Sequence, residues 1–233
     1  MKINNTDISA YCAKQFNVEY EHAAQSNGAQ WSAGALLPFL GRNRDGFSNL
    51  TITLLVKSAN GRDREEIKRN CSDILALLTG PVTIELDGFE TKYRAILQSH
   101  TETERSIRQY HLLKLTFLGY EFGLTRSYTG TGSVTVNNPG NMRSPVVLTI
   151  TPSAAKTELI IEGFGLDDIV IRNAAANVAI VVDGNDGSVS VGGSSIMSRV
   201  DMWDLPAVEH GDTTITCNDA SASMSASVTP LYR

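Results

Sequence analysis

Residues 128–151, YTGTGSVTVNNPGNMRSPVVLTIT, separate two halves of the chain that differ in character. Long strand-like runs around one strong helical pattern precede this stretch, and short apolar-alternating runs broken by turn residues follow it. Asn138-Pro139-Gly140 is typical of a turn, because Pro fixes φ and Gly accepts positive φ. Ser144-Pro145 restricts the backbone again. We therefore predict a domain boundary with a short, stiff linker, and domains at residues 1–128 and 129–233.

Length and composition indicate a globular protein. The chain has 233 residues, of which 42% are hydrophobic, enough for two ordinary domains that each bury a core. No run approaches about 20 consecutive apolar residues, and the N-terminus MKINNTDISAY lacks the apolar core of a signal peptide, so neither a membrane span nor export is indicated. Cys12, Cys71 and Cys217 form no Cys-x-x-Cys pair, which favours buried reduced thiols over a disulfide framework or a zinc site.

Charge is divided unevenly between the two halves. Residues 1–128 carry 15 Lys and Arg against 14 Asp and Glu, whereas residues 129–233 carry 5 against 11. Binding to phosphates needs clustered Lys and Arg, so stable nucleic-acid binding through the acidic half is not expected. The basic cluster at residues 61–69 has acidic residues interleaved at helical spacing, which favours a solvated helix face.

The first half predicts a mainly β domain with one helix. Residues 50–57 alternate as a half-buried strand, and apolar residues at helical spacing predict a helix over about 62–79, capped by Asn60 or by Asp63 with Glu66 in a loose capping box, and ended by Gly80-Pro81. Asp87-Gly88 between two alternating runs predicts a hairpin. Residues 107–122 are apolar on both faces, which predicts a central or interface strand. Residues 16–21 with Asn27-Gly28 suggest another hairpin arm, and residues 34–48 an exposed loop.

The second half predicts an antiparallel β-sandwich. Short runs with strand alternation, separated by turn residues, occur at 146–151, 159–163, 169–173, 178–183, 188–192, 213–217 and 224–229, without any helical pattern.

No motif for catalysis or metal binding emerges. His22, His100, His111 and His210 are scattered without ligand spacing, so each is expected to be a surface or strand histidine. Residues 183–187, DGNDG, resemble a calcium loop only superficially and predict a tight turn, and Gly192-Gly193 a loop. The paired carboxylates Asp167-Asp168 and Glu102-Glu104 are expected to be solvated. We therefore predict no catalytic, cofactor-binding or metal-binding residues, no cofactor and no enzymatic activity.

Several stretches, taken in order, resemble the distal tail proteins of long-tailed, siphovirus-type phages and prophages. They are PVTIELDGFETKYRAIL (81–97), HLLKLTFLGYEFG (111–123), VNNPGNMRSPVVLTIT (136–151), IVVDGNDGSVSV (180–191) and DLPAVEHGDTTITC (204–217). The chain departs from the family at residues 210–213, where Pro-Gly-x-Asn is common, and at its C-terminus, which lacks an aromatic, Arg-rich strand.

The resemblance implies a β-rich, ring-forming N-terminal domain with one helix that assembles into a homohexamer, followed by a galectin-like β-sandwich. It implies a virion structural protein, assembled in the host cytoplasm, that acts as a hub in the tail tip or baseplate. Its partners would be the tail tube protein and the tail-associated lysin or tip protein.

Three alternatives stay open. The sandwich could be a carbohydrate-binding module for host-surface recognition, with Trp203 beside Asp201 and Asp204 as the best candidate for a sugar-stacking aromatic, although a half-buried core Trp is the simpler expectation. The chain could instead be another tube or baseplate protein of similar β content. Hydrolysis is the third alternative.

Overall fold

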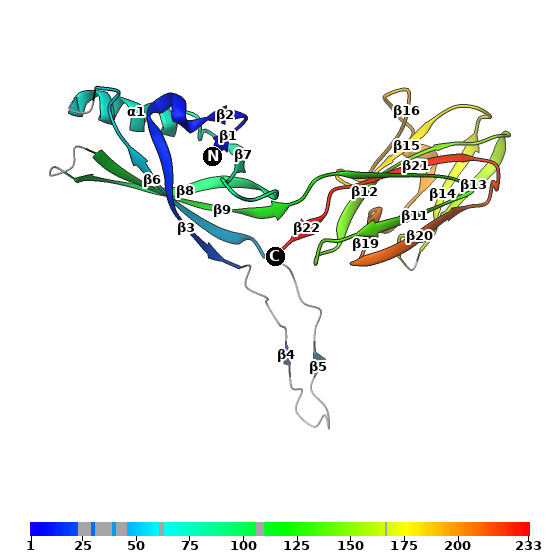
Figure 1. Cartoon of the computed structure of the whole chain (residues 1–233). Helices are drawn as coiled ribbons and strands as arrows, with labels where there is room; N and C mark the ends of the chain where they lie inside the picture. Colours follow the sequence, from blue (N-terminus) through cyan, green and yellow to red (C-terminus); the bar gives the residue numbers. More distant parts are fainter. Residues whose placement is uncertain (23–28, 31–38, 41–45, 61–62, 106–109, 166) are drawn as a thin grey trace. The chain divides into compact units, whose positions relative to one another are not determined.

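The structure is a computed structural model that describes all residues except 23–28, 31–38, 41–45, 61–62, 106–109 and 166. The chain divides into two compact units, Met1–Glu121 with Arg233, and Phe122–Tyr232 (Figure 1). Strand β10 (Arg126–Thr131) crosses the position 128/129 at which the sequence predicts a domain boundary. It pairs along its whole length with β21 (Ser223–Val228) of the second unit. Among the described residues, no helix has the length and apolar composition to cross a membrane.

The first unit is built on one sheet with the strand order β2-β1-β7-β8-β9-β6-β3. Strand β1 pairs antiparallel with β2 and β7, and β6 pairs antiparallel with β3 and β9. The strands are β1 (Lys2–Ile3), β2 (Thr6–Asp7), β3 (Ala13–Glu21), β6 (Ser48–Val56), β7 (Pro81–Glu85), β8 (Lys92–Arg105) and β9 (Tyr110–Phe122), with the 3-10 helix η1 (Ile8–Tyr11) after β2.

The strand predictions for this unit are confirmed. Leu50, Ile52, Leu54 and Val56 of β6 are fully buried, as their alternation indicates. Strands β7 and β8 form the predicted antiparallel hairpin, and Gly88 in its turn has a φ of 86°. Strand β9 lies between β8 and β6, in the centre of the sheet, as predicted.

Between β3 and β6 the structure describes one short antiparallel pair, β4 (Ala29–Gln30) with β5 (Phe39–Leu40). Strand β5 lies within residues 34–48, where the sequence suggests an exposed loop. Residues 27 and 28, which we interpreted together with residues 16–21 as a hairpin arm, lie outside the described residues.

Helix α1 (Arg64–Ala76) lies within the predicted range and packs on one face of the sheet (Figure 1). Asp63 is its N-cap, and its Oδ1 accepts hydrogen bonds from the backbone N–H groups of Glu65 and Glu66 at 2.9 and 3.1 Å. Glu66 accepts from Ala59 N at 3.0 Å rather than from Asp63, so the capping box is only half formed. The helix buries Ile67, Cys71 and Ile74 against the strands.

The second unit is a sandwich of two antiparallel sheets, with the strand orders β10-β21-β12-β15-β16-β17 and β11-β20-β13-β14-β18; β19 also pairs with β12. Buried side chains from both sheets form one core. The remaining elements are β11 (Ser133–Asn138), β12 (Ser144–Thr151), β13 (Lys156–Glu162), β14 (Ile169–Ala174), β15 (Ile180–Asp183), β16 (Ser188–Val191), β17 (Ser194–Ser195), η2 (Met197–Arg199), β18 (Val200–Asp201), β19 (Ala207–Val208), β20 (Gly211–Cys217) and β22 (Leu231–Tyr232).

The interpretation of residues 128–151 as a linker is wrong. Strand β11 pairs with β20, and β12 pairs with both β15 and β21, so this stretch crosses both sheets of the sandwich. Pro139 and Gly140 lie in the turn between β11 and β12, which carries the chain from one sheet to the other. Turn chemistry alone does not distinguish a turn inside a domain from a joint between domains.

Candidate functional site

The most exposed aromatic side chain of the second unit is Trp203, which is 87% exposed. It lies in the loop between β18 and β19, close in sequence to Leu205, which is 54% exposed. The expectation of a half-buried core Trp is therefore wrong. The acidic neighbours Asp201 and Asp204 are consistent with a surface loop. Exposed Trp residues of this kind serve as stacking or docking groups.

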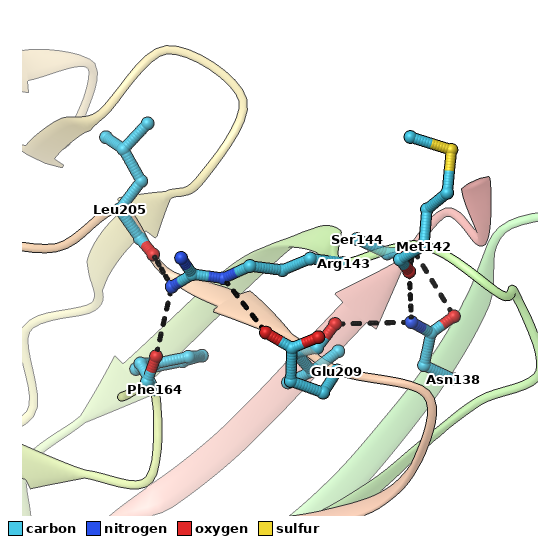
Figure 2. A network of polar contacts seen from close by, with 8 residues as sticks. Asn138, Met142, Arg143, Ser144, Phe164, Leu205 and Glu209 are labelled. Carbon is cyan, nitrogen blue, oxygen red and sulfur yellow. Dashed lines mark hydrogen bonds and ion pairs between the residues drawn. The ribbon is translucent and has the colours of Figure 1, made fainter. Parts of the chain in front are cut away.

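Arg143, from the turn between β11 and β12, holds the Trp203 loop to the sandwich. Its Nη2 donates to the backbone oxygens of Phe164 and Leu205, both at 3.3 Å, and its Nε lies 3.8 Å from Glu209 Oε1 (Figure 2). A guanidinium with several donors in a fixed plane suits such divergent acceptors. The backbone beside Trp203 is thus fixed by side-chain contacts, although Trp203 itself is exposed.

A second set of contacts packs the same loop against the DGNDG turn at residues 183–187. Val146 N donates to Pro206 O at 3.0 Å, and a Cβ added to Gly184 would lie only 1.9 Å from that oxygen. The turn itself is closed by Asp183 Oδ1, which accepts from Asn185 N at 2.8 Å. The predicted tight turn between strands is confirmed, since β15 and β16 pair on either side of it.

Asn138 anchors the turn that supplies Arg143. It is fully buried, and its Nδ2 donates to Met142 O at 3.1 Å and Val208 O at 3.2 Å (Figure 2). Its Oδ1 accepts from Gly140 N at 3.0 Å and from Ser144 Oγ at 3.3 Å. All four hydrogen-bonding positions of the amide are therefore occupied, so Asn138 has a structural role.

The second unit also contains a cavity, which is lined by residues of β14, β15, β16 and η2, among them Ile171, Arg172 and Arg199. Its volume of about 80 Å³ is far below the roughly 300–1,000 Å³ of small-molecule pockets. This cavity is therefore too small for a ligand of ordinary size.

In the first unit, the structure brings together Cys71 of α1, Glu102 of β8 and His111 of β9. One potential ligand atom from each lies within 4.8 Å of the other two. His111 is buried and its Nδ1 hydrogen-bonds Glu102 Oε1, while its Nε2 has no partner among the described residues. Burial, followed by the charge and hydrogen bonding of Glu102, raises the pKa of the Cys71 thiol to about 12.

Sequence reasoning missed this cluster, because it expected His111 to be a surface or strand histidine and Glu102 to be solvated. Glu104, the partner in the predicted solvated pair, forms a surface ion pair with Arg64 Nε at 3.1 Å. Local spacing carries no signal for the cluster, because its three residues come from three elements and meet only in the folded sheet. The other histidines are elsewhere: His210 Nδ1, for example, contacts Gly140 O at 2.8 Å.

The first unit also exposes several large apolar side chains. Phe16, in the bulge of β3, is 64% exposed, and Phe47 and Phe89 are 62% and 54% exposed. Phe89 packs edge-on against Tyr20, with the ring centroids 6.0 Å apart. Exposed aromatic groups of this kind are typical of surfaces that other proteins cover.

The fold as a whole is a β sheet carrying one helix, followed in the chain by an antiparallel sandwich. Among solved structures, that of the Dit protein (gp 19.1) of phage SPP1, described as a paradigm of the hub adsorption apparatus in phages infecting Gram-positive bacteria, is similar with a TM-score of 0.80. The match has 14% identity and covers 99% of this chain and 98% of that one.

Two structures of the phage P2 baseplate in its activated conformation are also similar. The structure with Ca matches with a TM-score of 0.54 and 11% identity, covering 96% of this chain and 92% of that one. The structure with Sr matches with a TM-score of 0.51 and 13% identity, covering 95% and 92%. No protein-family model and no curated protein sequence matches the chain. The resemblance to distal tail proteins is therefore confirmed in the fold, across nearly the whole chain.

Proposed function

We propose that this protein is a virion structural protein of a siphovirus-type tail tip. In this role it is a hub that joins the tail tube to the tail-associated lysin or tip protein of the baseplate. The observation that carries the proposal is the match to the SPP1 hub protein over 99% of the chain. Two further matches, to chains of a phage baseplate, point to the same kind of assembly. The role needs no enzymatic activity and no cofactor.

In this proposal the first domain mediates self-association of the chain into a homohexameric ring. The second domain is the galectin-like sandwich. The exposed aromatic groups Phe16, Phe47 and Phe89 supply apolar surface that subunit contact would bury. The net charge of −5 over the whole chain would limit adhesion to DNA that passes through the ring.

Light scattering coupled to size exclusion, with negative-stain imaging, tests the ring. Six copies of the 25.2-kDa chain amount to about 151 kDa. We expect a ring of this mass in the native protein, and dissociation in a Phe16→Ser/Phe89→Ser variant that keeps its circular dichroism spectrum. Leu205→Ser, which removes a comparably exposed apolar group from the second unit, is the matched control and should leave the ring intact. A stable monomer at high concentration, or a closed ring of another order, would contradict the hexamer.

The exposure of Trp203 supports a second candidate function, in which the sandwich binds a host-surface saccharide. An indole that is 87% exposed offers a stacking face, and the acidic residues Asp201 and Asp204 lie within two residues of it in the sequence. A glycan array of the native protein tests this candidate. Binding that is abolished in Trp203→Ala but retained in Trp203→Phe would establish it, and the absence of any glycan signal would leave the loop as a protein-docking surface.

A further inference from the structure

We propose that Cys71, Glu102 and His111 form a zinc-binding site in the first unit. This site departs from the sequence-based expectation of no metal ligands, and it is independent of the proposed role in the tail. The three residues belong to α1, β8 and β9, so a bound ion would tie the helix to the two long strands beneath it.

The spacing of the ligand atoms fits a single small ion. A sulfur atom, a carboxylate oxygen and a ring nitrogen lie within 4.8 Å of one another. Zinc binds sulfur at about 2.3 Å and nitrogen or oxygen at about 2.0–2.2 Å, so tetrahedral ligand atoms lie somewhat closer together than this upper limit. Small side-chain rotations would therefore complete the site. Three protein ligands leave a fourth position for water.

The chemistry of the donors selects the metal class. A thiolate and an imidazole favour zinc and similar transition ions over magnesium or calcium, which prefer oxygen ligands. Glu102 adds a negative charge, and its side chain is 31% exposed, which provides a route for an ion and its water. Cys71 and His111 are buried, which shields the soft ligands from competing solvent.

His111 provides the independent indication of a missing ligand. Its Nδ1 is engaged by Glu102, but Nε2 is buried and has no partner among the described residues. A buried polar atom without a partner is destabilising. Binding of the ion at Nε2 requires the Glu102 carboxylate to leave Nδ1 and turn toward the ion, so Glu102 is the side chain that must rotate to complete the site. A zinc ion bound at Nε2 would remove the unsatisfied position.

Zinc binding must displace the thiol proton of Cys71. Zinc binds cysteine as the thiolate, so binding is coupled to release of this proton.

The experiment uses the full chain without an affinity tag, stripped of metal by chelation and dialysis. After zinc is added in excess and the unbound ion is removed by a second dialysis, we expect mass spectrometry of the metal to find one equivalent of zinc per chain. Cobalt should produce a thiolate-to-metal charge-transfer band with intense visible bands of a tetrahedral site. Zinc at 100 times the dissociation constant should raise the melting temperature by roughly 5–10 °C.

Variants separate this site from adventitious binding. Cys71→Ser and Glu102→Gln should each lower the affinity at least tenfold, and Cys71→Ser should abolish the charge-transfer band. Glu102 is partly exposed, so its variant keeps the test valid even if Cys71→Ser fails to fold. The matched control Cys217→Ser, at a half-buried free thiol of the second unit, should bind as the native chain does. No stoichiometric zinc in the native chain, or equal loss in Cys217→Ser, would overturn the proposal.

Discussion

Replacing the buried Asn138 by Ala should destabilise the second unit by about 3 kcal/mol. The substitution removes four hydrogen bonds, but Met142 O and Ser144 Oγ still bond to each other at 3.0 Å. The groups that lose their side-chain partner outright are Gly140 N and Val208 O. Each buried polar group left without a partner costs about 1–3 kcal/mol, so the two groups together lower the free energy of unfolding by about 2–6 kcal/mol. Water that enters and bonds to these groups favours the lower half of that range.

Urea unfolding followed by circular dichroism measures this loss, and two matched variants identify its cause. Asn137→Ala, at the neighbouring position, removes one exposed hydrogen bond to Asp212 and should cost less than about 1 kcal/mol. Asn138→Asp keeps the volume but replaces two amide donors by a carboxylate oxygen that faces two carbonyl oxygens. It should therefore destabilise at least as much as Asn138→Ala. A near-native stability of Asn138→Asp, or equal effects of Asn137→Ala and Asn138→Ala, would refute the reasoning.

Three further predictions concern the second unit. Arg143→Ala should lower the free energy of unfolding by about 1–2 kcal/mol and speed amide hydrogen exchange in the Trp203 loop. Arg143→Lys should restore stability only partly, because lysine lacks the planar guanidinium group. Unchanged exchange in Arg143→Ala would contradict the anchoring role. Gly184→Ala places a Cβ 1.9 Å from Pro206 O, so it should lower the free energy of unfolding by more than about 2 kcal/mol in the same urea assay. An unchanged free energy would show that the loop shifts freely. Hydrogen bonds from Ser153 lower the pKa of Asp219 in the folded chain. The ionised carboxylate should therefore stabilise the fold fully above about pH 4, and this stabilisation should be lost as the pH falls through the lower pKa of the folded state. Asp219→Asn should weaken the dependence of stability on pH in this acidic range, and an unchanged dependence would contradict the role of Asp219.

Local patterns predicted most of the individual elements, because their causes are local. The helical spacing of Ile67, Cys71 and Ile74 and the N-cap at Asp63 located α1 to within three residues at its C-terminal end. The alternation in β6 and the Asp87-Gly88 turn of the β7–β8 hairpin are likewise set by neighbouring residues. Each of these signals lies within a few residues of the structure that it determines.

The failures share one physical cause, which is pairing across long sequence separations. Val136 of β11 pairs with Thr213 of β20, and Tyr128 of β10 with Ala226 of β21, so the role of residues 128–151 is decided by strands that follow much later. The same holds for Trp203, whose exposure depends on how its loop packs on Arg143 and the 183–187 turn. A residue type sets only a preference for a buried or an exposed position. The strands and loops that pack nearby decide which face of a segment is buried.

The anchored loop has a consequence for binding by the second unit. Arg143 and Pro206 hold the backbone on the C-terminal side of Trp203, and the short pairing of β18 with β14 holds it on the other. A rigid loop that carries a Trp loses little more than the freedom of two side-chain torsions on binding, so more of the interaction energy appears as affinity. Loosening the loop with Arg143→Ala should therefore weaken binding at Trp203 without touching the binding surface. Such a loss would occur for a saccharide and for a protein partner alike, so it tests the preorganisation of the surface separately from the identity of its ligand.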